Sequence, residues 1–156
     1  KANVGAGTIY RYFKNKEVRV NSVYQTYMKK LHEAISSQFP SSSSSYDQYI
    51  HIMNRLIQFA TENKEAFIFI ETHNHADYLD DESKKTVFQM EEFLCEFINN
   101  GKRRGEIQPN LPCGVIISLA YGSFVALFKK IEAGLLEAKP EMLENYLEAV
   151  WQSIKA

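Results

Sequence analysis

Apolar residues recur at steps of three and four along most of this chain, which is the spacing of one face of an α-helix. The first long run predicts an amphipathic helix over about residues 16–38, with Asn15 as its N-cap. Its apolar positions are Val20, Val23, Tyr24, Tyr27, Leu31 and Ile35. Alternation typical of a strand never extends beyond a few residues. The sequence therefore predicts an all-α fold.

Loop signals divide the next part of the chain into two further helices. The run PSSSSS predicts a flexible surface loop, and Ser45 with Gln48 has the spacing of a capping box that begins a second helix. Asn63 and Lys64 interrupt this helix. The stretch EAFIFIETHNH then continues as a shorter, mostly buried helix.

The C-terminal half shows the same kind of pattern. Asp80 begins a helix whose first-turn acids suit the helix dipole, and Gly101 or Gly105 ends it. A connector with two prolines follows. Two more helices are expected, over about 112–138 and 140–155.

Composition is that of an ordinary soluble globular protein of one domain, or of a module of a larger one. The chain has 156 residues, 45% of them hydrophobic and 24% charged, with a net charge of -1. No overall attraction to nucleic acid or to an anionic membrane follows from that charge. The first 30 residues are different, because they oppose the single acid Glu17 with Lys1, Arg11, Lys14, Lys16, Arg19, Lys29 and Lys30.

Cys95 and Cys113 are too few for a disulfide framework and lack the spacing of metal ligands. We therefore expect buried, reduced thiols in a cytoplasmic protein. The longest apolar stretch, VIISLAYGSFVALF, is shorter than the ~18 residues that indicate a membrane span. The sequence predicts no membrane partner and no cofactor.

The opening stretch, KANVGAGTIYRYFKNKE, contains two glycines one residue apart. A dinucleotide-binding turn needs a third glycine and a βαβ unit, and a Walker-type loop needs Gly-Lys-Ser/Thr, so neither fits. A helix-turn-helix fits better, because NVGAG supplies a turn and a helix start without bulky side chains. Ile9 and Phe13, four residues apart, would face inward. Hydroxyl and guanidinium donors would project over one helical turn from Thr8, Tyr10, Arg11 and Tyr12.

This opening resembles the recognition-helix signature of the tetracycline-repressor (TetR) family of bacterial transcriptional regulators, A-G-V-S-x-G-T-I/L-Y-x-Y/H-F-x-x-K-E-x-L. The match covers about residues 2–18 and includes Val4, Gly7, Thr8, Tyr10, Tyr12, Phe13, Lys16 and Glu17. The rest of the chain resembles the family only in architecture, with helices suited to a ligand-binding and dimerisation part.

The resemblance implies DNA contacts by Gly7, Thr8, Tyr10, Arg11, Tyr12 and Lys16. The first two would begin the recognition helix in the major groove of double-stranded operator DNA. The middle pair would reach base edges or phosphates, and the last two would hold the DNA backbone. Ile9 and Phe13 would pack this helix onto its own small core.

Two positions depart from the family pattern, and one segment is absent. Asn3 replaces a turn glycine, which Asn tolerates, and Arg19 replaces an apolar residue and points either to solvent or to a phosphate. The family places two helices before this point, so we expect this chain alone to bind DNA poorly, with residues 1 to about 15 loosely held. The implied organisation is the end of a DNA-binding domain with its connecting helix over 1–38, and a ligand-binding and dimerisation domain over 39–156.

The helix after Pro112 is apolar nearly all round, so it must be covered on two sides. Together with a second apolar stripe on the last helix, it would pair with a symmetry copy in a four-helix interface, which the resemblance also implies. Gly122 and Ser123 would permit close approach, and a single central core is the alternative. The expected homodimer interface consists of Ile117, Tyr121, Val125, Phe128, Met142, Tyr146 and Ala149.

A small-molecule effector is a further implication of the resemblance, with its pocket among the helices of residues 46–128. Aromatic and aliphatic residues there favour a hydrophobic or aromatic ligand, although each of them more often serves as ordinary core. The expected lining consists of Phe59, Phe67, Ile70, Phe88, Phe93, Tyr121 and Phe124.

The stretch ETHNHADYLDD raises the question of a metal site or a catalytic group. His73 and Asp77 alone share a helix face, so structural roles are favoured, and no metal and no enzyme activity are predicted. The leading hypothesis is a ligand-responsive repressor that binds a palindromic operator as a homodimer. The alternative is a helical ligand-binding or protein-interaction domain without a role on DNA.

Overall fold

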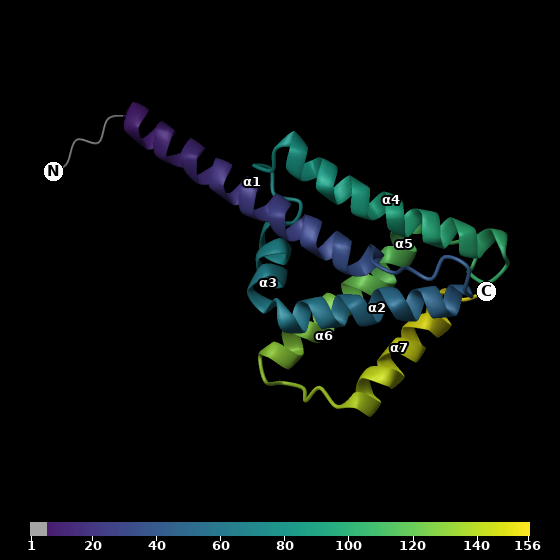
Figure 1. The fold of residues 1–156 in the computed structure, drawn as a ribbon. Coiled ribbons are helices and arrows are strands. Elements are labelled where there is room, and N and C mark those ends of the chain that lie inside the picture. Colours follow the sequence, from purple (N-terminus) through teal and green to yellow (C-terminus); the bar gives the residue numbers. More distant parts are fainter. Residues whose placement is uncertain (1–5) are drawn as a thin grey trace. The chain divides into compact units, whose positions relative to one another are not determined.

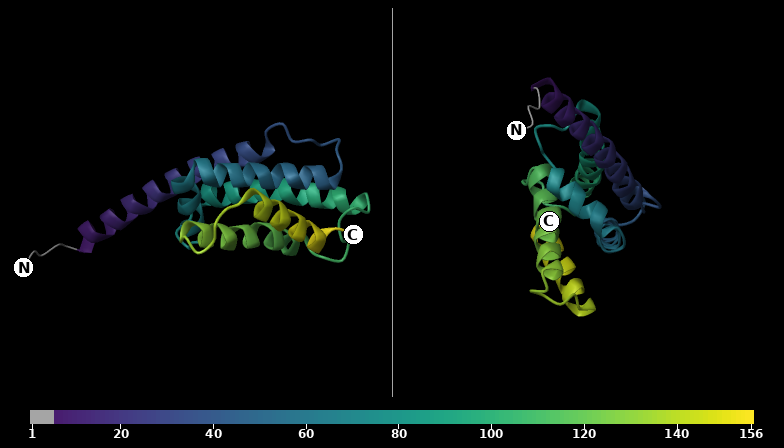
Figure 2. Two further views of the ribbon diagram at one scale, coloured as in Figure 1. Left: turned by 90° about the horizontal axis from the view of Figure 1, so that it is seen from below. Right: turned by 90° about the vertical axis from the view of Figure 1, so that its left-hand side faces the viewer.

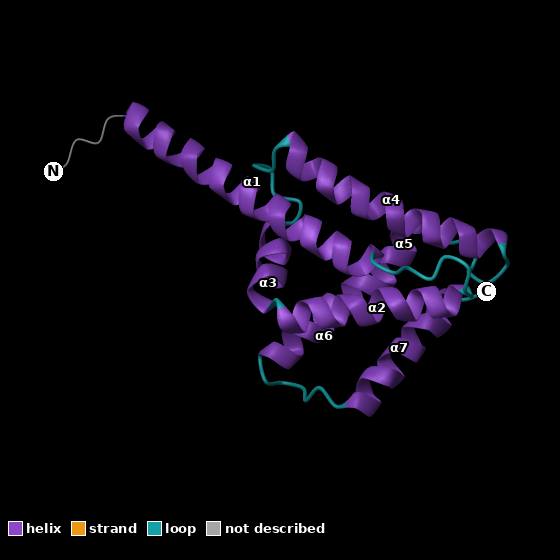
Figure 3. Cartoon of the chain, viewed as in Figure 1, coloured by secondary structure: helices purple, strands orange, loops and turns teal. Residues whose placement is uncertain are grey.

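The computed structural model describes the backbone of residues 6–156 and the side chains of residues 11–156 (Figure 1). Within these residues the chain is helical, with no strand and an isolated β-bridge between Ile107 and Lys155 (Figure 3). The predicted all-α fold is confirmed. The helical elements are α1 (Ala6–Ser36), α2 (Ser45–Glu62), α3 (Lys64–His73), α4 (Asp81–Arg103), α5 (Cys113–Ile117), the π-helix η1 (Ser118–Gly122), α6 (Ser123–Glu132) and α7 (Pro140–Ile154).

Helix α1 is continuous over 31 residues and passes through position 15. The sequence predicted a helix start there with Asn15 as N-cap, and this prediction is wrong. The stretch 11–17 contains neither Gly nor Pro, and one Asn lowers helix propensity by less than about 1 kcal/mol. Helical residues on both sides outweigh that small penalty, since extending a helix is far easier than starting one.

A reciprocal pair of polar side chains begins α2. The backbone N–H of Asp47 donates to Ser44 Oγ (3.1 Å), and that hydroxyl donates to Asp47 Oδ2 (2.7 Å). The capping box therefore starts at Ser44, and its prediction at Ser45 and Gln48 is wrong by one residue. The reason is burial: Ser45 is fully buried, and its backbone N–H donates to Glu106 Oε2 (2.7 Å).

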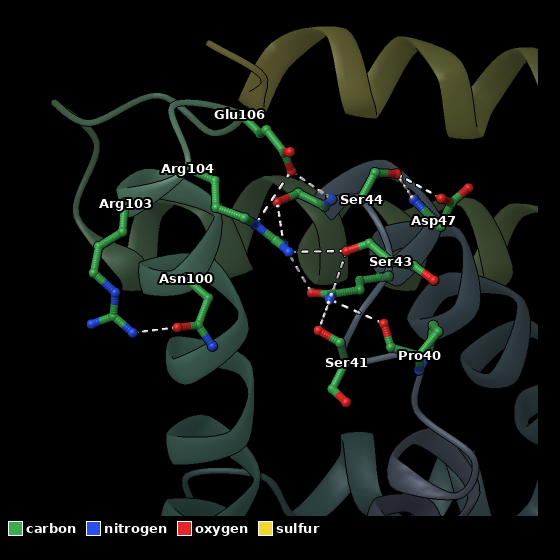
Figure 4. Close-up of polar contacts among 11 residues, drawn as sticks. Pro40, Ser41, Ser43, Ser44, Asp47, Asn100, Arg103, Arg104 and Glu106 are labelled. Atoms are coloured by element: carbon green, nitrogen blue, oxygen red, sulfur yellow. Dashed lines mark hydrogen bonds and ion pairs between the residues drawn. The ribbon is translucent and has the colours of Figure 1, made fainter.

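The serine loop, residues 39–44, is held by hydrogen bonds from Gln48 and from Arg104, and Figure 4 shows the contacts of Arg104. Gln48 Nε2 lies 3.0–3.1 Å from the carbonyl oxygens of residues 40, 41 and 43. Arg104 Nη1 donates to Ser43 O (2.9 Å), and Arg104 Nε lies 3.5 Å from Glu106 Oε2. The pKa of Glu106 is lowered, chiefly by its hydrogen bond with Ser45. The loop lies at the surface as expected, and three of its carbonyl groups are bonded to the body of the protein.

Two glycines in the left-handed conformation end α4 and α6. Gly105 has φ +70°, and the N–H of Glu106 reaches back to Gly101 O (2.9 Å), so α4 ends as predicted. Gly134 has φ +69° and ends the next helix at Glu132. The prediction that the helix after Pro112 continues to residue 138 is therefore wrong. The left-handed conformation of Gly134, which glycine adopts without strain, is not helical and turns the chain away from the helix axis.

The chain divides into two compact units: unit 1 comprises Lys1–Ser37 with Arg55–Met90, and unit 2 comprises Gln38–Asn54 with Glu91–Ala156. In unit 1, α1 and α3 lie side by side (Figure 1). In unit 2, α7 lies along η1 (Figure 2). The largest fully buried apolar side chains are Tyr24, Phe67 and Ile70 in unit 1, and Tyr49, Met53, Ile98, Ile107, Ile116 and Ile154 in unit 2.

A disulfide joins Cys95 in α4 to Cys113 at the start of α5, with 5.7 Å between their Cα atoms. The expectation of two reduced, buried thiols is therefore wrong for this structure, and both residues are only half-buried. The pairing has no local sequence signal, because the cysteines are 18 residues apart. It arises because the chain reverses between α4 and α5 within unit 2.

Among the described glycines, Gly101 is the one at which an added side chain would meet the nearest neighbouring atoms. A Cβ there would lie 2.5 Å from Ile107 Cδ1 and 2.7 Å from Ser45 Oγ, and both of these residues are fully buried. We expect Gly101→Ala to lower the free energy of unfolding by about 1–3 kcal/mol despite the better helix propensity of Ala. Gly114→Ala, which meets nothing within 4 Å, is the matched control and should leave stability unchanged or raise it. Urea unfolding of both variants decides, and equal effects would contradict the packing argument.

Candidate functional site

The first described side chains of α1, those of residues 11–19, form a basic and exposed stretch of helix. Residues 11–19 are all exposed, among them Arg11 and Lys16, and Figure 2 shows this part of the helix extending past the other elements of unit 1. Tyr12 is 68% exposed. Gly7, Thr8 and Tyr10, also predicted to contact DNA, lie in α1, and the side chains of Thr8 and Tyr10 fall outside the described part of the structure. The described positions leave Arg11, Tyr12 and Lys16 free of any core role.

Apolar side chains on the same half-helix are exposed as well. Phe13, expected to pack onto a small core of its own, is 56% exposed and contacts the edge of the Tyr12 ring, and Val18 is 61% exposed. Arg19, whose direction the sequence left open, is exposed to solvent. This exposed helix carries both basic and aromatic side chains. Such a surface suits binding to another macromolecule, since large apolar groups at a surface commonly mark interaction sites.

Asn21 is the first buried residue among the described side chains of α1, and its amide makes all four of the hydrogen bonds open to it. Its Oδ1 accepts from the backbone N–H of Asp80 (2.9 Å) and from Ser83 Oγ (2.7 Å). Its Nδ2 donates to Glu17 O (3.0 Å) and to Tyr78 O (2.9 Å). This Asn21 cluster fastens α1, just beyond its exposed half, to the start of α4. The sequence analysis missed it; its only sequence signal is an Asn on the apolar face, four residues after Glu17 and three before Tyr24.

Asp80 and Gln25 complete the polar joint. Asp80 is the N-cap of α4, because its Oδ1 accepts from the backbone N–H of Ser83 (2.8 Å), as the predicted helix start implies. Gln25 Nε2 donates to the same Asp80 oxygen (3.1 Å) and to Ser83 Oγ (3.1 Å). These bonds, led by the one from the Ser83 backbone, lower the pKa of Asp80. The carboxylate therefore stays charged where the N-terminal end of α4 favours a negative group.

Contacts within unit 1 hold the side chains at the end of α3 and just after it. His73 packs against the Phe69 ring with centroids 4.2 Å apart, and its Nδ1 contacts the Tyr78 hydroxyl. Tyr24 OH donates to Asn74 Oδ1 (3.1 Å), and burial, with Glu71 nearby, raises the pKa of Tyr24 to about 12. Among the described residues no group of three metal-ligating side chains comes together.

The residues expected to line an effector pocket fall in both units. Phe59, Phe67 and Ile70 of unit 1 are buried, whereas Phe88 on α4 is 62% exposed. In unit 2, Phe124 is buried, Phe93 packs on Phe39 with ring centroids 5.1 Å apart, and Tyr121 is half-buried. Phe88 thus differs from the other six in having most of its surface in solvent.

The apolar helix, Cys113–Glu132, comprises α5, η1 and α6. Of the interface residues expected on it, Phe128 is buried and Ile117, Tyr121 and Val125 are half-buried. The residues of this helix that are exposed at steps of four, three and four are Val115, Leu119, Gly122 and Ala126. Sequence reasoning missed the first two as surface residues, because every side of this helix is apolar and the exposed side has no distinct signal.

The last helix is fastened to the apolar helix by a hydroxyl pair. Tyr146 OH lies 2.9 Å from Ser123 Oγ and donates to Ala120 O (3.3 Å), and burial raises the pKa of Tyr146. Met142, also expected in the interface, is half-buried, and Ala149 is exposed.

The apolar helix is also the one candidate among the described residues for a membrane span, by its 20-residue length and its composition. Its apolar window is 11% buried within the chain. A single helix of this kind is weak evidence for a membrane, since a helix that is covered by another protein surface passes the same test.

Comparison with known proteins finds relatives that are transcriptional regulators. Residues 24–156 match the family described as tetracyclin repressor-like, C-terminal domain. An uncharacterised helix-turn-helix transcriptional regulator from Haemophilus influenzae is 21% identical over 155 residues, which cover 99% of this chain and 81% of that protein.

Solved structures give the same result. A putative TetR-family regulator from Vibrio parahaemolyticus is 27% identical with a TM-score of 0.73, over 97% of this chain and 82% of that one. A TetR-family regulator from Marinobacter aquaeolei is 19% identical with a TM-score of 0.79, over 96% and 78%. The first supports both family and fold, and the second supports the fold.

These relatives define the class of this protein, which is a transcriptional regulator. Within that class the chain belongs to the TetR family, because the family's C-terminal domain matches it over residues 24–156. The earlier resemblance is confirmed, and the protein is a non-enzymatic regulator.

Proposed function

We propose that this regulator binds a palindromic operator as a homodimer and leaves it when a small hydrophobic or aromatic effector binds. The observation that carries the DNA part is the exposed basic half of α1, whose described residues include Arg11, Tyr12 and Lys16. In this proposal Gly7, Thr8 and Tyr10 join them, and helices upstream of Lys1 complete the DNA-binding domain. This chain covers 81% of its Haemophilus influenzae relative.

Dimerisation gives the two DNA-reading helices a fixed separation. Half-sites one DNA turn apart require a two-fold axis in the protein, and the apolar helix with α7 supplies a surface for it. An effector releases the DNA only if its affinity differs between the DNA-binding form and the released form. Aromatic side chains in both units favour an apolar effector.

The direct test is DNA binding by a longer chain that includes the upstream helices, on its own upstream intergenic DNA at two salt concentrations. We expect salt-sensitive, sequence-selective binding by the longer chain and weak binding by the 156-residue chain. Selective binding by neither chain would favour the alternative, a helical ligand-binding domain without a role on DNA.

Charge removal on the exposed half of α1 gives a sharper prediction. In the longer chain, Arg11→Ala and Lys16→Ala should each weaken operator binding, and each side chain that binds a phosphate should, on its removal, reduce the slope of log affinity against log salt by about 1. Lys30→Ala is the matched control, because Lys30 is also exposed on α1 but lies about 21 Å further along the helix than Lys16. If all three variants behave alike, the DNA surface does not lie where we place it.

A further inference from the structure

The disulfide-bonded pair Cys95 and Cys113 has no role in the proposed function. Both residues lie in unit 2, their Cα atoms are 5.7 Å apart, and that separation is within the range of disulfides. Each residue is half-buried, so neither is sealed inside the core. No other Cys is present in the chain, and the pair therefore has no competing partner.

We propose that Cys95 and Cys113 form a reversible thiol–disulfide site, oxidised by a small-molecule disulfide such as glutathione disulfide. A regulator that acts on genomic DNA works where thiols are kept reduced, and disulfides there are usually transient or sensing. Partly exposed disulfides are also the ones that exchange readily. Only this argument about compartment rests on the family; the pairing itself rests on geometry.

The chemistry balances with one equivalent of the small disulfide. The thiolate of one cysteine attacks a sulfur of the small disulfide, forms a mixed disulfide and expels one small thiolate. The second cysteine then attacks the protein sulfur of that mixed disulfide, forms the Cys95–Cys113 bond and expels the second thiolate. The two protein thiols lose two electrons and two protons, and two small thiols carry them away.

The bond is placed where it controls the first turn of the apolar helix. The chain before Cys113 is already held, because the N–H groups of Glu106 and Ile107 donate to Gly101 O and the Lys102 ammonium donates to Leu111 O. Helix α5 itself begins at Cys113, and its N-cap residue, Pro112, makes no side-chain hydrogen bond to it.

Apart from the disulfide, the main anchor of this turn is Ile116, which is 2% exposed. Val115 and Leu119 on the same turns are exposed. Reduction therefore leaves Ile116 as the main anchor of this turn, which lies at the end of the helix that presents the proposed dimer face, whereas oxidation adds a covalent bond to α4.

Thiol exchange in the 156-residue chain tests the site directly. We would equilibrate it in glutathione buffers of graded ratio, trap free thiols by alkylation in acid-quenched samples, and count them by mass spectrometry. Two free thiols at reducing ratios and none at oxidising ratios, at monomer mass, would support the site. Failure to pair, pairing between chains, or a bond that no glutathione ratio reduces would overturn it.

Two further readouts test the effect on α5 without any DNA or dimer. Hydrogen exchange at the amides of residues 115–118 should quicken by at least about 10-fold on reduction, because local opening becomes easier. The thermal midpoint should fall by roughly 6–12 °C, as expected for opening a closed loop of this length. The variant carrying Cys95→Ser and Cys113→Ser should match the reduced form in either buffer. Unchanged exchange on reduction would overturn the control of α5.

Self-association separates this inference from the proposed function. Sedimentation of oxidised and reduced chains should give dimer dissociation constants that differ by about 5-fold or more, which is a typical size for coupled sites. If thiol pairing and hydrogen exchange respond but the chain is monomeric in both states, the redox site stands and the proposed dimer fails. If the chain dimerises but the thiols never pair, the dimer stands and the redox site fails.

Discussion

Replacing Asn21 with Leu should lower the free energy of unfolding by about 3 kcal/mol, one of the largest losses expected from a single polar residue in this chain. Leu has nearly the same size, so the change removes polar contacts rather than volume. The carbonyl of Tyr78 and the backbone N–H of Asp80 then lose their partner, and the Ser83 hydroxyl loses the acceptor of its hydrogen. Ser83 is fully buried, so water does not easily replace Asn21 there.

The matched control is Gln25→Ala on the same helix. Gln25 donates to Asp80 Oδ1 and Ser83 Oγ, but it is only half-buried. Without it, Asp80 Oδ1 keeps its bond from the Ser83 N–H, and the Ser83 hydroxyl keeps its bond to Asn21. Its loss should cost less than about 1 kcal/mol. Urea unfolding of both variants compares the two losses. A second set, Asn21→Ala, Ser83→Ala and the double variant Asn21→Ala/Ser83→Ala, gives the coupling energy. A coupling energy near zero would mean that the Asn21 cluster does not act as a unit.

If the proposed function is right, Asn21→Leu should also change operator binding. Asn21 lies between the exposed half of α1 and the buried half that packs with α3. Loosening this joint leaves the surface charges of Arg11 and Lys16 intact. Operator affinity in the longer chain should therefore fall while its dependence on salt keeps the same slope, which distinguishes a positioning residue from a phosphate contact.

Helix positions and most of their ends could be predicted from the sequence because their causes are local. The apolar period of three and four predicted the helices, Asp80 predicted the start of α4, and the interruption at Asn63 was confirmed. Errors arose where two local signals compete. Serine occurs at 41–45, and the choice of Ser44 over Ser45 as cap depends on which of them is buried against Glu106, a contact 61 residues away.

The parts of the site that depend on distant pairing could not be predicted in this way. The Asn21 cluster joins residues more than 55 positions apart, and the disulfide depends on how the chain reverses after α4. By contrast, the opening motif is contiguous, so residues 2–18 alone indicated the family that residues 24–156 confirm. The exposed face of the apolar helix could be predicted only in part. The composition predicts that the helix is apolar on all sides, but it does not predict which side stays exposed to solvent.

A charge on the open face of the apolar helix should separate the proposed dimer. Leu119 is 38% exposed, lies between Val115 and Gly122 on the exposed stripe, and would be covered by a second copy. A two-fold interface contains each residue twice, so Leu119→Glu buries two unpaired carboxylates at once. We expect the dimer dissociation constant to rise by at least about 100-fold, measured by sedimentation of the 156-residue chain.

Ile68→Glu is the matched control for this change, because Ile68 is 44% exposed on α3, which belongs to unit 1 and contributes no residue to the stripe. The same apolar-to-acidic change should leave self-association within about two-fold of the unmodified chain, since no interface group is touched. Circular dichroism and thermal midpoints of both variants show whether each keeps its fold. A folded Leu119→Glu chain that dimerises like the unmodified one would place the interface elsewhere. An unmodified chain that is monomeric at micromolar concentration would remove the dimer from the proposal, and with it the reason for a palindromic operator.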